Sequence, residues 1–355
     1  MGAQAKTYIA ICLSAVAMAG VFAYNLPWLV LPIALSIFFW NTTLTVKPYT
    51  LKHLLWQTGL FFAIYHTVVL SWFLDVDINM LAGLDETYSI FVQSISLLIM
   101  VAVLTLASLP LGIVIYKLQS RMRQANILAL IILASSWTVV EWLRSIIFSI
   151  FLNAPEASIG DYWNFGSLGL GVVSSPFGFL SRLVGLYGLS FLVVCLSLII
   201  FWLMKKRFML PLAVLILATT GSFAASKLWQ SSDKQPFEAR FLQRESTFDG
   251  LLDDVPIRNK SDTLKDLIVL PEYSDVYAQR RKIFSQRNIT SQLSSIGVVL
   301  DVSADFENAG PRYSYLLTRD KQNIIDSQTK RLLIPTGEYL PNILKGFYAL
   351  TGQTN

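Results

Sequence analysis

The chain has 355 residues, of which 54% are hydrophobic and only 14% are charged. Soluble domains carry about 25% charged residues, so this composition excludes a wholly soluble protein and indicates a membrane protein. The net charge of +5 does not indicate a nucleic-acid-binding protein, because the basic residues are spread among loops instead of forming one stripe. The two cysteines, Cys12 and Cys195, both fall in apolar runs, so the polar part of the chain has neither a disulfide nor a thiol nucleophile of its own.

Seven apolar runs predict a transmembrane domain over residues 1–226. The first run is interpreted as a retained helix, although Ala15-Val16-Ala17 also resembles a signal-peptide cleavage site. The second run is short for a membrane span, and the fourth is long enough to need tilt or a kink, which Pro110 can supply. The runs are Tyr8–Tyr24, Trp28–Trp40, Leu54–Leu74, Ser89–Tyr116, Ile127–Ile147, Leu183–Met204 and Met209–Ala225.

Basic residues are concentrated in alternate loops between these runs. Lys6 precedes the first run, and the loops after the second, fourth and sixth runs carry several Lys or Arg, whereas residues 75–88 carry only acidic charges. The positive-inside rule therefore predicts a cytoplasmic N-terminus and an extracytoplasmic segment after Ala225. The long loop Asn153–Ser181, rich in Gly, Ser and aromatic residues, is predicted to lie outside, either as an interfacial aromatic belt or as a lipid-facing gate.

Three ionisable residues fall inside predicted membrane spans. Glu141 and Arg144 are three positions apart on one helix face, which predicts a structural ion pair, with contact to a lipid headgroup as the alternative. His66 is expected to be packed or hydrogen-bonded within the bundle. His66 and His53 are the only histidines, which excludes a His-based metal site or serine triad, and no cofactor is expected.

Residues 227–355 have the pattern of a mixed α/β domain on the outer, periplasmic side. Strands are predicted at Phe237–Gln243, Asp266–Leu270 and Ile296–Val302, followed by a hairpin of Arg312–Thr318 and Asn323–Asp326, with a helix at Val276–Leu293 between the second and third strands. After Asp266 the second strand is apolar, as in a strand covered on both faces, and Pro271 marks its end.

Two short motifs in this region present candidate catalytic groups. Glu272 directly follows the second strand, where a fixed carboxylate can act as a general base, although a surface acid at a strand end has the same pattern. Lys330 precedes a short apolar run that ends at Pro335, and Gly337 then permits a turn that presents Glu338. A lysine near a carboxylate in a dry site can stabilise an oxyanion; the alternative is a solvated lysine beside Arg331.

These motifs, in this order after seven spans, resemble the apolipoprotein N-acyltransferase family. The resemblance rests on Leu270-Pro-Glu272 and on Lys330-Arg-Leu-Leu-Ile-Pro-Thr-Gly-Glu338, and Glu141-Trp-Leu-Arg144 looks like the family's helix motif. It covers nearly the whole chain. It implies an α-helical transmembrane bundle followed by an αββα nitrilase-like extracytoplasmic domain, here incomplete at its C-terminal side, in a bacterial inner membrane.

The resemblance also implies a reaction and its partners. An acyl chain would pass from a phospholipid to the N-terminal amine of a diacylglyceryl-cysteine apolipoprotein, through a thioester on a cysteine. By match to the family, Glu272 would be the general base, Lys330 would stabilise the oxyanion and Glu338 would be an accessory carboxylate. The partners are then the phospholipid donor, the diacylated apolipoprotein and membrane lipids, without nucleic acid, metal or cofactor.

The chain departs from the family's pattern at several positions. No cysteine follows Cys195, and Leu270, Leu332 and Thr336 stand where the family usually has Trp, His and Phe. The favoured explanation for the missing cysteine is a partial reading frame. The alternatives are that a separate polypeptide carries the remainder or that the chain is a degenerate homologue. As it stands, the chain is expected to be unable to form a thioester. A non-catalytic protein that binds lipid or lipoprotein and a membrane-tethered nitrilase-type amidase are the alternative functions.

Overall fold

The protein folds as two compact units, one of helices and one of strands. The computed structural model describes residues 3–43, 49–75, 86–124, 126–154 and 159–206, five strands between 237 and 329, and residues 342 and 345. The first unit comprises Met1–Ser232 and Ile334–Asn355, and the second comprises Asp233–Leu333. The predicted helix at Val276–Leu293 and the seventh apolar run lie outside the described residues.

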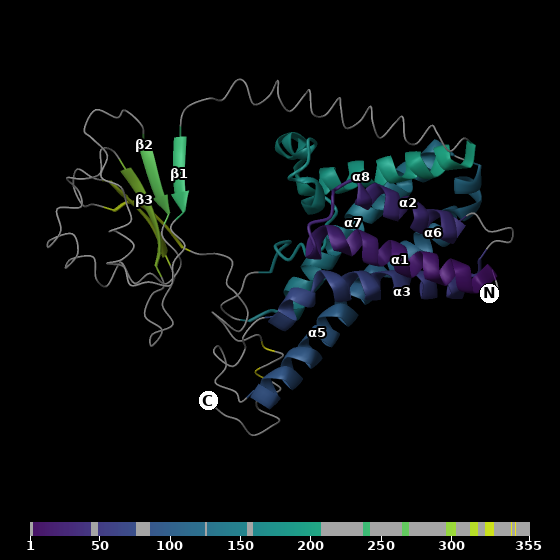
Figure 1. Ribbon diagram of the computed structural model, residues 1–355, viewed down its shortest axis with the longest axis horizontal. Coiled ribbons are helices and arrows are strands. Elements are labelled where there is room, and N and C mark those ends of the chain that lie inside the picture. Colours follow the sequence, from purple (N-terminus) through teal and green to yellow (C-terminus); the bar gives the residue numbers. More distant parts are fainter. Residues whose placement is uncertain are drawn as a thin grey trace. The chain divides into compact units, whose positions relative to one another are not determined.

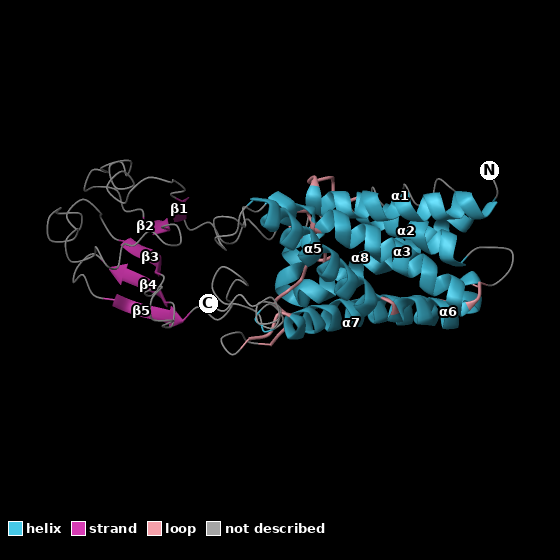
Figure 2. Cartoon of the chain, turned by 90° about the horizontal axis from the view of Figure 1, so that it is seen from below, coloured by secondary structure: helices cyan, strands magenta, loops and turns pink. Residues whose placement is uncertain are grey.

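The first unit is a bundle of long apolar helices that lie side by side (Figures 1 and 2). Short 3₁₀ segments η1 (Ser71–Asp75), η2 (Leu170–Val172) and η3 (Gly178–Leu180) occur at one end of the bundle, which we call the loop-bearing end. The long helices are α1 (Ala3–Ala23), α2 (Val30–Thr43), α3 (Leu51–Val69), α5 (Glu86–Ser108), α6 (Pro110–Arg123), α7 (Ile127–Phe151) and α8 (Ser181–Lys206).

Five described segments are long and apolar enough to cross a membrane, which confirms the membrane class predicted from composition. α2 is shorter: its 14 residues extend about 21 Å at 1.5 Å per residue, less than a hydrocarbon core of about 30 Å. The prediction of seven spans is thus supported for five of them, and α2 is the marginal one. The five segments are Gln4–Ala23, Leu51–Asp75, Ile90–Arg123, Ile127–Phe151 and Gly178–Met204.

The chain has a break between α5 and α6 at Pro110, the position where a kink is predicted. α5 ends at Ser108 and α6 begins at Pro110, which occupies the first helical turn. Proline has no N–H to donate to the carbonyl of Leu106, and this carbonyl accepts from the amide of Leu109 at 3.2 Å instead. α5 is inclined to α1 and α3 in Figure 1.

The bundle core is built from aromatic and aliphatic side chains of all the long helices. Phe38 of α2 stacks on Phe61 of α3 with ring centroids 4.2 Å apart, and Trp137 of α7 lies 5.5 Å from Phe62. Two helices begin with side-chain caps that bind otherwise unpaired amides: Thr50 accepts from the amide of His53, and Asn126 accepts from that of Ala129.

The second unit contains a five-stranded mixed sheet in the order β1-β2-β3-β4-β5 (Figures 1 and 2). β1 to β3 are parallel, and β4 and β5 continue antiparallel. The strands are β1 (Phe237–Phe241), β2 (Lys265–Val269), β3 (Ile296–Val302), β4 (Tyr313–Thr318) and β5 (Ile324–Thr329). The sequence predicts each of them to within two residues, except that β5 runs three residues further. The nitrilase-like fold of this unit stays a prediction.

Candidate functional site

The three predicted catalytic residues, Glu272, Lys330 and Glu338, lie outside the described residues. Within the part of the chain that the structure describes, no cluster of His, Cys, Asp and Glu could hold a metal ion. The chemistry-bearing groups that the structure does bring together are the ionisable residues inside the helix bundle.

Glu141 lies in the interior of α7 and binds three donors. One carboxylate oxygen accepts from the indole N–H of Trp137 at 3.0 Å and from the backbone amide of Leu168 at 3.1 Å. The other accepts from the hydroxyl of Ser167 at 2.8 Å. Glu141 is only 3% exposed, so these bonds replace the hydration that the carboxylate loses in the bundle.

Arg144, one turn further along α7, is equally buried and binds two acceptors. One guanidinium nitrogen donates to the carbonyl of Phe165 at 3.0 Å, and the other is 3.1 Å from Nε2 of His66. Guanidinium groups only donate, so Nε2 of His66 must carry a lone pair and the imidazole must be neutral. The proton then sits on Nδ1, which is 3.5 Å from the Thr105 hydroxyl of α5.

Residues 164–169 form a tight turn that polar side chains of three helices hold inside the bundle. The hydroxyl of Tyr65 (α3) donates to the carbonyl of Gly166 at 2.6 Å, and Ser190 (α8) accepts from the amide of Gly169 at 2.9 Å. With the bonds to Glu141 and Arg144, one backbone group in each of Phe165, Gly166, Leu168 and Gly169 has a side-chain partner. We call this segment the re-entrant turn.

The re-entrant turn lies deeper in the bundle than the C-terminal end of α7. Glu141 precedes the last residue of α7, Phe151, by ten positions, about 15 Å at 1.5 Å per residue. Ser167 and Leu168 are buried at this level. Irregular backbone at membrane depth is tolerated only where protein groups satisfy its N–H and C=O groups, since lipid cannot. Glu141 and Arg144 of α7 therefore supply hydrogen-bond partners to the backbone of the re-entrant turn.

The predicted ion pair between Glu141 and Arg144 is wrong. Both side chains are described, and they bind the turn and His66 instead of each other. Spacing along the helix makes the two groups neighbours, but each is turned toward backbone groups that would otherwise be unpaired. The prediction that His66 is hydrogen-bonded within the bundle is confirmed.

Sequence reasoning missed the re-entrant turn, because Asn164–Gly169 has the small and polar composition of an ordinary outer loop. The available signal was the presence of three ionisable residues, Glu141, Arg144 and His66, inside apolar spans. Such groups need partners from elsewhere in the chain.

Gly166 is the residue of the turn for which substitution should be least tolerated. Its φ of +64° is rarely adopted by L side chains, and an added Cβ would lie 2.8 Å from the Tyr65 hydroxyl oxygen. Gly166→Ala should lower the free energy of unfolding by about 1–3 kcal/mol, measured by denaturation in detergent micelles. Gly59→Ala in α3 is the matched control, because its Cβ would meet its nearest neighbour at an ordinary 3.5 Å. Equal stability of the two variants would contradict the assigned conformation.

On one side of the re-entrant turn lies an aromatic cluster of Trp72, Phe148, Trp163 and Phe165. Phe165 packs edge-on against Phe148 with centroids 5.5 Å apart and stacks on Trp163 at 5.8 Å. Trp72, from η1, lies 6.3 Å from Phe165 and is half exposed. Amphipathic aromatic side chains of this kind are typical of the membrane interface. This observation fits the predicted interfacial aromatic belt.

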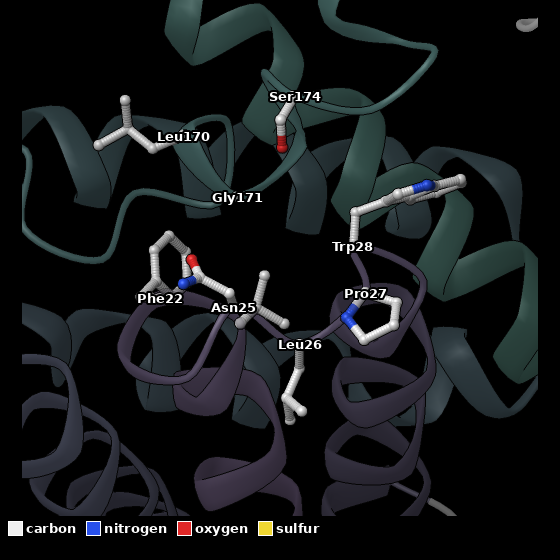
Figure 3. Close-up of a pocket in the computed structure, with 9 residues that line it drawn as sticks. Phe22, Asn25, Leu26, Pro27, Trp28, Leu170, Gly171 and Ser174 are labelled. Carbon is white, nitrogen blue, oxygen red and sulfur yellow. The ribbon is translucent and has the colours of Figure 1, made fainter.

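On the other side of the turn is an open pocket of about 400 Å³ (Figure 3). One wall is the chain just after the turn, where Leu170, Gly171 and Ser174 lie, and the other is the end of α1 with the bend that leads to Trp28. Asn25 adopts a left-handed φ of 53° in this bend. No charged side chain lines the pocket, and its polar side-chain groups are those of Asn25, Ser174 and the Trp28 indole (Figure 3).

A comparison with protein families finds a match over most of this bundle. Residues 14–199 match the family model described as the apolipoprotein N-acyltransferase N-terminal domain. No curated protein matches the chain. The matched range contains the whole polar network, from Tyr65 to Ser190, and both walls of the pocket.

Proposed function

The chain belongs to the apolipoprotein N-acyltransferase family, and from this we propose that it serves N-acylation of lipoproteins, moving an acyl chain from a phospholipid to the N-terminal amine of a diacylglyceryl-cysteine apolipoprotein. The family match over residues 14–199 is the observation that carries the proposal. The membrane-spanning helices support this proposal, because both substrates are anchored in the membrane and reach a membrane enzyme by lateral diffusion.

The proposed reaction has two acyl-transfer steps. In the first, Glu272 takes the proton of a cysteine thiol, and the thiolate attacks the phospholipid ester. The C–O bond breaks, the proton returns to the leaving oxygen, and a lysophospholipid departs from the thioester. In the second, the lipoprotein amine attacks the thioester, giving an amide and restoring the thiol. Covalent catalysis of this kind divides one difficult transfer into two easier ones.

The other proposed residues act on the tetrahedral intermediates of both steps. Lys330 places a positive charge near the developing oxyanion, where a preorganised charge in a dry site stabilises it strongly. Glu338 is proposed as an accessory carboxylate that orients the lysine or the attacking group. Cys12 and Cys195 lie in the apolar helices α1 and α8, and neither is proposed as this thiol.

The orientation proposed from charge places the loop-bearing end on the periplasmic side. Ile159 lies at that end and Gln124 at the opposite end, and both are exposed. In a chain with Cys12→Ala and Cys195→Ala, we expect Ile159→Cys to react with a membrane-impermeant maleimide in intact spheroplasts. Gln124→Cys should react only after permeabilisation. The reverse pattern would invert the orientation and place the α/β unit in the cytoplasm.

The function is tested with the protein that the whole reading frame encodes, purified in detergent and mixed with a phospholipid and two acceptors. The acceptors are a diacylated lipopeptide with a free N-terminal amine and a small soluble primary amide. The proposal predicts that the lipopeptide gains one acyl chain by mass spectrometry. Hydrolysis of the amide alone would indicate a membrane-tethered amidase. Tight lipid binding without either product would indicate a non-catalytic lipid-binding protein.

A further inference from the structure

The ends of the re-entrant turn connect directly to the two surfaces that flank it. Phe165, whose carbonyl accepts from Arg144, belongs to the aromatic cluster. Gly169, whose amide donates to Ser190, is followed at once by Leu170 and Gly171 of the pocket wall. The position of both surfaces is therefore set by how firmly the turn is held.

Close to the turn the pocket wall is η2, a single 3₁₀ turn without a side-chain cap. Its Val172 is buried in the bundle core, whereas Leu170 and Val173 are about half exposed. Gly171 approaches the opposite wall so closely that an added Cβ would lie 3.1 Å from the ring of Phe22. A shift of the turn by an ångström would therefore open or close the space between Gly171 and the end of α1.

Both flanking surfaces present apolar side chains toward the surroundings of the bundle. Trp72 of the aromatic cluster and Leu170 of the pocket wall are 49% and 46% exposed. Neither surface carries a charged side chain among its described residues, and the pocket offers only neutral polar groups. Uncharged walls that combine apolar side chains with neutral hydrogen-bonding groups suit acyl chains and ester groups better than a phosphate or an ammonium ion.

We propose that Glu141 and Arg144 are positioning residues for lipid binding. By clamping the re-entrant turn, they fix the aromatic cluster and the pocket wall as two surfaces that hold the acyl chains of a lipid substrate. This inference rests on the proposed function for the identity of the reaction. The clamp itself does not depend on that function. Neither residue touches the lipid; both act through the backbone of Phe165 to Gly169.

The clamp is tested first without any activity, by cysteine labelling of residues 1–355 in membranes. Leu168→Cys, in a chain with Cys12→Ala and Cys195→Ala, keeps the backbone amide that donates to Glu141 and starts fully buried. We expect Glu141→Gln to raise its maleimide labelling rate at least about tenfold, because a hydrogen bond to a charged group contributes about 1.5–3 kcal/mol. The control is Trp142→Ala on the lipid-facing side of α7, which should leave the rate unchanged. Equal labelling in all three chains would overturn the clamp.

The positioning role is tested second, by steady-state acyl transfer with the protein of the whole reading frame. The proposed catalytic groups are untouched in Glu141→Gln, so we expect KM for the phospholipid to rise about tenfold with kcat changed less than about threefold. Glu141→Asp, which keeps the charge, should recover part of the loss. A merely structural defect would lower the active fraction, and hence kcat, at constant KM; that result would overturn the proposal. If the unsubstituted protein transfers no acyl chain, the proposed function is wrong. The labelling experiment still shows whether Glu141 and Arg144 hold the re-entrant turn.

Discussion

Glu272→Gln and Lys330→Ala should each lower the rate of acyl transfer by about two to four orders of magnitude. A positioned general base contributes about 10²–10⁴-fold, and one oxyanion-stabilising group contributes about 10²–10³-fold. Glutamine has the size of glutamate but cannot take the thiol proton, and alanine removes the charge beside the oxyanion. The rate is measured as lipopeptide acylation under single-turnover conditions, so that lipid exchange does not limit it.

Matched variants separate these roles from general effects of charge. Glu307→Gln removes a carboxylate of the same unit outside the motifs, and Arg331→Ala removes the positive charge next to Lys330. Both should stay within about threefold of the unsubstituted rate, as expected for solvated surface groups. If Lys330→Ala were no slower than Arg331→Ala, Lys330 would be an ordinary surface lysine and its assignment would fall.

Arg144→Ala should be the most destabilising single substitution in the helix bundle, lowering the free energy of unfolding by about 3–5 kcal/mol. The substitution leaves two buried acceptors, the carbonyl of Phe165 and Nε2 of His66, without their charged donor. A hydrogen bond to a charged group contributes about 1.5–3 kcal/mol. Unfolding is measured by denaturant titration in micelles, following tryptophan fluorescence. Arg121→Ala, at an exposed position in the last turn of α6, is the control and should change stability by no more than about 0.5 kcal/mol.

A double-mutant cycle shows whether the two buried charges act together. Both side chains hold the same turn, so a turn released by the first substitution has already lost bonds that the second would remove. The double variant should therefore be more stable than the sum of the two single effects predicts. Strictly additive effects would mean that the carboxylate and the guanidinium stabilise the turn independently.

The helices could be predicted from the sequence, because length and hydropathy alone decide whether a segment can cross a membrane. The run Ser89–Tyr116 illustrates this: its excess length called for a kink, Pro110 offered one, and α5 and α6 meet there. Strand β3, Ile296–Val302, was predicted at both ends from its largely apolar composition, which only Asp301 interrupts. These signals are local, because the apolar surroundings in a membrane or a sheet favour apolar residues along the whole helix or strand.

The re-entrant turn could not be predicted, because what buries it is not local. Gly166 and its partner Tyr65 are 101 residues apart, and nothing in the composition of Asn164–Gly169 distinguishes it from a solvated loop. The same limit explains the error on Glu141 and Arg144: their spacing on one helix favoured a pair, whereas partners on other segments bind both. The catalytic assignments have a different basis. Glu272, Lys330 and Glu338 rest on motif resemblance and stay predictions.

Transfer of an acyl chain from a phospholipid to a lipoprotein amine can be followed with an isotopic label. The protein of the whole reading frame is mixed with a diacylated lipopeptide and a phospholipid that carries one labelled acyl chain, and the lipopeptide's N-terminal fragment is analysed by mass spectrometry. We expect the label there as an amide, with one lysophospholipid released per acylated peptide. Label found only in free fatty acid or in unchanged phospholipid would show that this member of the family does not transfer the chain to the amine.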